Sequence, residues 1–295
     1  MITTTEWLFT IGILGTVIIF DLLLAIVRRN KDTSPKEALG WTLFYVVAAV
    51  SFGLLLPHWA PQSYRKEFFA GWLTEYSLSV DNLFVFIILL ATLKIKKESQ
   101  QLVLLLGIMI AIVLRVILIF LGVALVTRFT WAFFFFGAFL IYTAYKLINE
   151  KSEVEHEEAK LVTFLRKRGF STFSIALIAL GFTDLIFALD SIPAILGLTT
   201  SSYVVITANI FALMGLRQLY FLLQGMMDRL IFLSRGLAFI LAFIGVKMVL
   251  HAVHSLGVEV PEVSLEVSLG VIVLTLVVTA VTSLLATKSP DKRAL

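Results

Sequence analysis

The sequence predicts an all-α polytopic membrane protein. Of its 295 residues, 59% are hydrophobic and only 15% are charged, whereas soluble domains usually carry about 25% charged residues. Apolar runs of about 20 residues recur along the chain, the length that an α-helix needs to cross the hydrocarbon of a bilayer. No soluble segment of domain size interrupts them, so we expect residues 1–295 to form a single transmembrane domain.

About nine transmembrane helices are expected from the apolar runs and the polar segments between them. RRNKDTSPKE separates the first run from the second, and KIKKESQ separates the third from the fourth. The first run begins almost at Met1 without a basic leader, so we expect it to be retained rather than removed as a signal peptide. The expected ranges are 6–27, 36–56, 68–93, 100–125, 130–148, 172–196, 201–225, 233–254 and 264–287.

The distribution of Lys and Arg predicts how the helices are oriented. With the N-terminus outside, the segments on the cytoplasmic side hold 18 Lys and Arg residues and the external segments hold 3. Cytoplasmic loops of membrane proteins carry the excess of these residues. We therefore expect an N-out, C-in topology in a bacterial inner membrane, and no nucleic-acid partner.

The cytoplasmic segment 149–171 begins with an acidic stretch, residues 150–158. We expect a solvated linker there. The alternative is a regulatory loop that senses metal through His156 and the neighbouring glutamates.

Two segments of the chain resemble each other, TEYSLSVDN (74–82) and TDLIFALDS (183–191). Each places two acids six residues apart and follows the second acid with a small polar residue. These residues are Glu75, Asp81 and Asn82 in the first segment and Asp184, Asp190 and Ser191 in the second.

The helices that follow also correspond. GIMIAIVLR and NIFALMGLR each carry an Arg eight residues after their start, at Arg115 and Arg217, and the segments AFLIYTAYK and AFIGVK of the next helices end at Lys146 and Lys247. Helices three to five (about 68–148) would therefore repeat as helices six to eight (about 172–254). Because three is an odd number, the second unit must enter the membrane from the opposite face. Inverted repeats of this kind are typical of secondary transporters, whose substrate site lies between the repeats.

The four acids of the repeat predict an ion path. Charged side chains within a bilayer are costly and usually mark routes for ions or protons. Antiparallel pairing of the third and sixth helices would bring Glu75 level with Asp190 and Asp81 level with Asp184. Carboxylates that close cannot all be ionised, so the cluster can hold protons and release them when a cation arrives.

The charges of the membrane segments suit a divalent cation. Counting Asp21, the acids contribute −5 and the three bases +3 (Arg115, Arg217 and Lys247), which leaves −2 for one divalent cation or two protons. We expect the bases to balance charge and lock helix packing. Oxygen donors suit Mn²⁺, Ca²⁺ or Mg²⁺, and the absence of cysteine argues against copper(I) and thiolate-bound zinc. Asn82, Ser191 and Asn209 would be neutral helpers.

A spacing of six residues turns an ideal helix by about 240°, so the two acids of one helix do not share a face. Separate roles are therefore expected, one acid coordinating the cation and the other relaying protons. The rival interpretation is a purely structural cluster of acids paired with bases. An intramembrane aspartyl protease is not expected, because no Gly-x-Gly-Asp segment precedes Asp81 or Asp184, and we expect no enzyme activity.

The segments EYSLSVDNLFVF, FTDLIFALDSIPAI and NIFALMGLRQLYF closely resemble motifs of the TerC/Alx family of integral membrane proteins. The resemblance runs from about Asp21 to Lys247; the start of the fourth helix is more aliphatic than the family pattern, and the acidic 150–158 stretch is less typical. It implies manganese export, metal homeostasis and an association with tellurite resistance. By matching position, it also implies that the cation site comprises Glu75, Asp81, Asn82, Asp184, Asp190 and Ser191.

Together these observations predict a secondary transporter that exports divalent cations, with Mn²⁺ as substrate, in exchange for protons. The expected partners are the cation, protons and the lipid bilayer, with no permanently bound cofactor. The alternative is a non-transporting accessory protein in metal or tellurite resistance or in membrane-protein biogenesis. The residues leave the metal selectivity, the coupling ion and the oligomeric state open.

Overall fold

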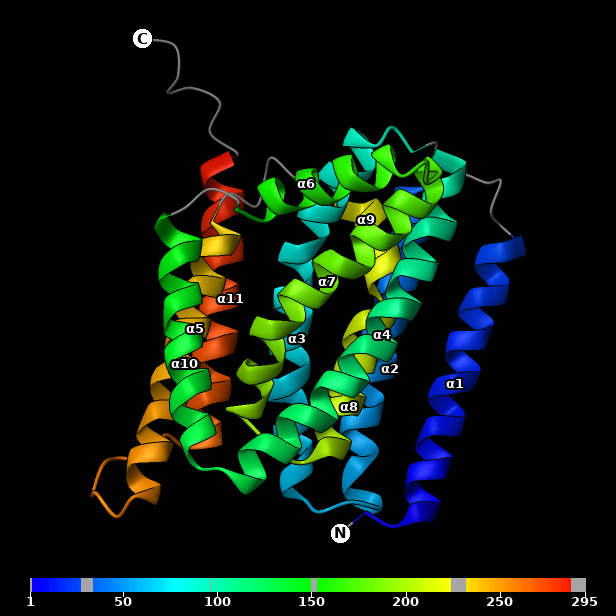
Figure 1. Ribbon diagram of the computed structural model, residues 1–295. Helices are drawn as coiled ribbons and strands as arrows, with labels where there is room; N and C mark the ends of the chain where they lie inside the picture. Colours follow the sequence, from blue (N-terminus) through cyan, green and yellow to red (C-terminus); the bar gives the residue numbers. More distant parts are fainter. Residues whose placement is uncertain (1, 28–33, 96, 150–152, 224–231, 288–295) are drawn as a thin grey trace.

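The computed structural model describes residues 2–27, 34–95, 97–149, 153–223 and 232–287, and within these ranges the secondary structure is entirely helical. Most helices run along one common direction, and successive ones alternate up and down (Figure 1). They are α1 (Thr4–Val27), α2 (Pro35–Leu55), α3 (Ser63–Thr92), α4 (Lys97–Arg128), α5 (Trp131–Asn149), α6 (Glu153–Lys167), α7 (Thr172–Leu196), α8 (Ser202–Met214), α9 (Leu216–Leu223), α10 (Leu233–Ser255) and α11 (Leu265–Thr287), with a short 3-10 turn at Leu56–His58.

Local sequence signals explain where several helices begin. Ser34 accepts a hydrogen bond from the backbone N–H of Glu37, and Pro35 occupies the first turn of α2. Ser171 accepts from the N–H of Ser174 at the start of α7. Both serines satisfy backbone donors that the first helical turn leaves unpaired, so each fixes the entry into a membrane helix.

The expected helices are found, but not all of them are established as membrane spans. Seven helices of the described residues are long and apolar enough to cross a bilayer, and α8 with α9 would make an eighth as one bent span. The apolar part of α1, Thr4–Phe20, is shorter. The count of nine spans therefore stays a prediction.

The expected helix 201–225 is broken into α8 and α9, which meet at an angle of 41°. Gly215 lies at the break, and glycine weakens a helix because its backbone has the greatest freedom to lose. Tyr45 and Tyr76 lie beside this position. The break places Asn209 in the first half of the span and Arg217 in the second.

Part of the expected linker 149–171 is helical, because residues 153–167 form α6. Leu161, Val162 and Leu165 lie on one side of this helix and pack against α7. Arg166 and Lys167 lie in its last turn, where positive charge complements the helix dipole. The side chain of His156, the proposed metal sensor, lies outside the described residues.

Both ends of the bundle agree with the alternation expected from the charges. The C-terminal ends of α1, α3, α5 and α11 lie at the upper end in Figure 1, as do the N-terminal ends of α2, α4, α7 and α10. These are the helix ends nearest to the segments rich in Lys and Arg. As a result, each helix of α3–α5 runs opposite to its counterpart in α7–α10: α3 opposite to α7, α4 opposite to α8 with α9, and α5 opposite to α10.

Gly137 of α5 and Gly245 of α10 make a reciprocal contact at the most extensive helix pairing of the bundle. A Cβ on Gly137 would lie 2.8 Å from the carbonyl oxygen of Gly245, and a Cβ on Gly245 would lie 2.8 Å from that of Gly137. The next neighbours correspond too, since Val249 faces Gly137 as Ile141 faces Gly245, and each lies four residues after its own glycine. The two helices therefore meet about a local two-fold axis.

Replacing Gly245 with alanine should destabilise the bundle. The added methyl group would meet backbone that cannot rotate away, and overpacking of this kind typically costs about 1–3 kcal/mol. Thermal unfolding of the detergent-solubilised protein measures the effect. Gly270→Ala is the matched control, because no atom lies within 4 Å of a Cβ there; equal unfolding temperatures for both variants would contradict the close packing.

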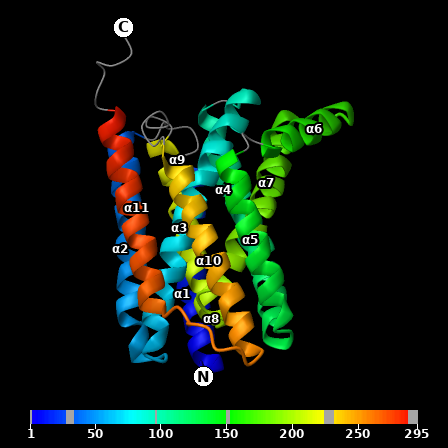
Figure 2. The same ribbon diagram turned by 90° about the vertical axis from the view of Figure 1, so that its left-hand side faces the viewer.

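The last helix, α11, has polar contacts with both halves of the bundle. Glu266 accepts a hydrogen bond from Lys66 of α3 at 2.5 Å, and Ser268 accepts from Lys247 of α10 at 2.9 Å. At the other end of α11, Ser283 accepts from the backbone N–H of Phe232, at the start of α10. The helix therefore lies along α3 and α10, as Figure 2 shows for the latter.

Candidate functional site

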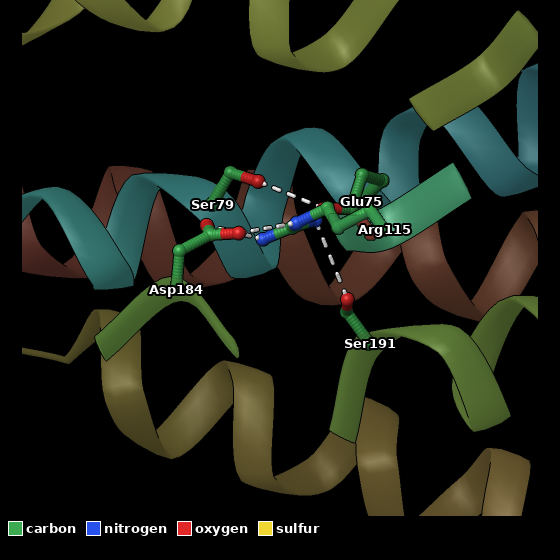
Figure 3. Close-up of polar contacts among 5 residues, drawn as sticks. All are labelled: Glu75, Ser79, Arg115, Asp184 and Ser191. Atoms are coloured by element: carbon green, nitrogen blue, oxygen red, sulfur yellow. Dashed lines mark hydrogen bonds and ion pairs between the residues drawn. The ribbon is translucent and has the colours of Figure 1, made fainter. Parts of the chain in front are cut away.

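Arg115 lies at the centre of a buried ionic cluster where α3, α4 and α7 meet. Its side chain comes from α4 and is 0% exposed. Its Nε and Nη2 donate to the two carboxylate oxygens of Asp184 on α7, both at 2.8 Å, which is a bidentate pair (Figure 3). Its Nη1 forms an ion pair with Oε1 of Glu75 on α3. Arg115 thus joins an acid of the first unit to an acid of the second.

Two serines complete this cluster. Ser79, one turn after Glu75, donates to its Oε1 at 3.0 Å, and Nη1 of Arg115 donates to Oγ of Ser191 at 3.5 Å (Figure 3). Glu75 and Asp184 are both buried. With both carboxylates ionised, these three side chains carry a net charge of −1. Ionisable side chains within membrane-spanning helices often lie along ion or proton paths.

One carboxylate oxygen of the cluster remains available. Oε2 of Glu75 is buried and has no hydrogen-bond partner among the described residues. A buried acceptor left unpaired costs free energy. This oxygen is therefore the atom of the cluster best placed to take up a proton or contact a cation.

Asp190 faces a different helix from Asp184. Thr143 of α5 donates to its Oδ1 at 3.0 Å, and the positive charge of Lys146, one turn further along α5, acts on the same carboxylate. Asp190 is partly exposed, whereas Asp184 is buried. Asp190 thus points to α5 and Asp184 to α4, and two different directions are expected for a rotation of about 240° between the acids.

The contacts of Arg115 bear on the alignment that we expected for the two helices. Its Nη1 contacts both Glu75 and Ser191, the residue after Asp190, so Glu75 lies near the level of Ser191 (Figure 3). The carboxylate of Asp190 itself meets Thr143 of α5, and the side chain of Asp81 lies outside the described residues. The convergence of all four acids therefore stays a prediction.

The other predicted residues lie around this centre or outside the described side chains. Asn82, Asn209 and Arg217 are buried in α3, α8 and α9, and Nδ2 of Asn209 has no partner among the described residues. Asp81 and Asp21 belong to α3 and α1, but their side chains lie outside the described part of the chain.

Lys247 belongs to another part of the molecule. Its Nζ donates to Ser268 of α11 rather than to a carboxylate of the cluster. It lines a cavity of about 600 Å³ together with Glu67 and His251. Glu67 accepts a hydrogen bond from Thr199 at 2.6 Å beside this cavity. The cavity lies at the end of the bundle that the charges assign to the outside.

Sequence reasoning missed Ser79 and Thr143 as partners of the acids. Ser79 lies four residues after Glu75, a helical spacing that would have identified it. Thr143 had no such signal, because its contact with Asp190 depends on how α5 packs against α7. Within the part of the chain whose side chains are described, no three histidines or carboxylates are grouped closely enough to hold a metal ion.

Comparison with known proteins agrees with the motifs at this cluster. Residues 60–291 match the profile of the integral membrane protein TerC family. The chain is 37% identical to Alx of Salmonella typhi, described provisionally as a membrane-bound redox modulator, over 88% of each chain. It is 36% identical to a membrane protein of Mycobacterium tuberculosis over 98% of this chain and 81% of that one.

Alx of Escherichia coli, described in the same terms, is 34% identical over 91% of this chain and 92% of its own. No solved structure gives a significant match. Both the matched range and the coverage of these relatives include the whole ionic cluster. The chain is a multi-pass membrane protein that belongs to the integral membrane protein TerC family.

Proposed function

We propose that this protein is a secondary transporter that exports divalent cations from a bacterial cell across the inner membrane. Its substrate would be Mn²⁺, with Ca²⁺ and Mg²⁺ as the competing cations, and export would be coupled to proton entry. The proposed topology is N-out, C-in. Transport, not catalysis, is the activity, and the metal is cargo rather than a resident cofactor.

The observation that carries this proposal is the pairing of Glu75 and Asp184 through Arg115. Two acids from different units of the bundle share one buried guanidinium. Both are oxygen donors of the kind that Mn²⁺ prefers. A cation that reaches this point replaces the guanidinium as their counter-ion, so cation binding and movement of Arg115 are coupled.

The arrangement of the helices supports alternating access. The units α3–α5 and α7–α10 run in opposite directions (Figure 1), and α5 and α10 meet through the reciprocal contact of Gly137 and Gly245. These features agree with an inverted repeat, in which one unit rocks against the other around a shared site. Glu75 and Asp184 occupy equivalent positions in the two units.

The separate surroundings of Asp190 support proton coupling. It interacts with Thr143 and Lys146 and is partly exposed. Asp190 would therefore accept and release a proton without breaking the pair between Arg115 and Asp184. In this proposal Asp184 contacts the cation and Asp190 relays the proton.

Flux measurements in proteoliposomes test the proposal. We expect Mn²⁺ movement with counter-flow of protons for the wild type, followed by a Mn²⁺-sensitive dye and a pH-sensitive dye together. Asp184→Asn should lower the Mn²⁺ flux at least about tenfold, because it removes a charged ligand of the cation. Glu262→Gln is the matched control, an exposed acid paired with His251.

Loss of flux in Asp184→Asn with wild-type flux in Glu262→Gln would support the proposal. A folded, reconstituted wild type that moves none of Mn²⁺, Ca²⁺ and Mg²⁺ would overturn it. The complete pairing of Arg115 would then favour the alternative of an accessory protein in metal or tellurite resistance or in membrane-protein biogenesis. Mn²⁺ flux without any pH change would show that transport is not coupled to protons.

The redox description of the Alx relatives raises the question of which redox chemistry this chain could support. The chain contains no cysteine. Any redox role here would therefore proceed without thiol–disulfide exchange within the chain. Control of the supply of a redox-active metal is one way in which a transporter acts on cellular redox balance.

A further inference from the structure

Helix α6 lies across the end of the bundle, in contrast to the long helices. It runs across them at the upper end in Figure 1, and Figure 2 shows it projecting sideways past α7. This is the end where the Lys and Arg distribution places the cytoplasm. A helix in this position lies in the plane of the membrane surface.

The inward side of α6 is already occupied. Leu165 is buried in the apolar cluster that includes Ile175 of α7, and Leu161 and Val162 pack beside it. The helix is therefore fixed to the bundle through its C-terminal half. Its remaining surface is directed away from the protein core.

Two aromatic side chains remain exposed beside this attachment. Phe164 is 54% exposed and Phe170, in the turn before α7, is 47% exposed. Arg168 lies over the ring of Phe164, with its Cζ 5.1 Å from the ring centroid. Phe side chains together with Lys and Arg are typical of helices that lie in the membrane interface.

The same segment carries four exposed cations, here called the basic patch. None of them forms an ion pair with an acidic side chain of the described residues. The acids of α6 are confined to its first six residues, EVEHEE, so every charged residue in the rest of the helix is basic. The basic patch comprises Lys160, Arg166, Lys167 and Arg168.

We propose that α6 and the turn after it bind anionic phospholipid of the cytoplasmic leaflet. The basic patch would contact the phosphate groups, while Phe164 and Phe170 enter the boundary between headgroups and acyl chains. Three observations combine here: the direction of α6 across the bundle, its level at the ends of the spans, and exposed rings beside basic side chains that form no ion pair with an acid of the described residues. This inference does not depend on the transport proposal.

The absence of cysteine makes a sharp test possible, because one introduced cysteine can be labelled alone. The full chain carrying Phe164→Cys is labelled with an environment-sensitive fluorophore and placed in nanodiscs of phosphatidylcholine with or without phosphatidylglycerol. We expect phosphatidylglycerol to shift the emission to the blue and to raise it at least about twofold, as for a probe entering the interface. Leu256→Cys, exposed at the opposite end, is the control label.

The matched variant replaces the basic patch with Lys160→Gln, Arg166→Gln, Lys167→Gln and Arg168→Gln in the labelled chain. Loss of the phosphatidylglycerol response in this variant, with intact thermal unfolding, supports the proposal. Equal emission in both lipid mixtures would overturn it, as would a response that survives neutralisation of the patch. If that equal emission is the emission of a probe in water, the surface is open to a soluble protein partner instead of lipid.

Discussion

Replacing Arg115 with methionine is expected to lower the free energy of unfolding by about 3–5 kcal/mol, as found when one partner of a buried ion pair is removed. The guanidinium is the shared counter-ion of Glu75 and Asp184, and all three side chains are buried. Without it, two carboxylates remain in apolar surroundings and must take up protons or draw in water. Thermal and denaturant-induced unfolding in detergent measure the loss.

A triple variant distinguishes loss of charge balance from loss of packing. Adding Glu75→Met and Asp184→Leu to Arg115→Met removes all three charges and leaves apolar side chains in their place. Well-packed apolar replacements of a buried ion cluster are often as stable as the original, so most of the lost stability should return while Mn²⁺ flux stays absent. An Arg115→Met protein as stable as the wild type would show that the guanidinium is not the counter-ion of these acids.

The second large effect concerns Asp190 and the coupling of transport to protons. In Asp190→Asn, Mn²⁺ uptake driven by a pH gradient should fall at least about tenfold, because the proposed proton acceptor has been removed. Exchange of labelled for unlabelled Mn²⁺ at equal pH should continue, since Asp184, the proposed ligand of the cation, is unchanged. Asp184→Asn should lose both activities.

Thr143→Val is the control for this distinction. It removes the hydroxyl that donates to Asp190 but keeps the carboxylate. Its pH-driven uptake should therefore fall less than that of Asp190→Asn, and its Mn²⁺ exchange should match the wild type. If Asp190→Asn abolished exchange as completely as Asp184→Asn does, the two acids would share one role.

The helices of the membrane domain could be predicted from sequence because apolar runs of spanning length are a strong and local signal. The same reasoning missed α6, where the apolar residues occupy only one side, and the break at Gly215. A single glycine within an apolar run does not by itself show whether a helix continues. The bend of 41° depends on how α8 and α9 pack against their neighbours.

The residues of the ionic cluster could also be found from sequence, since charges within apolar runs are few. The partners of these residues could not be found in this way. That Arg115 bridges α3 and α7 depends on the distance between helices remote in the sequence, and that Asp190 meets Thr143 depends on the packing of α5. Rotation of about 240° between paired acids did predict that Asp184 and Asp190 face different helices.

The position of α11 has a consequence for any movement of one unit against the other. Glu266 and Ser268 lie within one helical turn, yet the first contacts α3 and the second contacts α10. A displacement between these helices must lengthen or break at least one of the two contacts. The N-terminal turn of α11 is therefore a natural place for a pair of spectroscopic probes, which would register the displacement that the proposed alternating access requires.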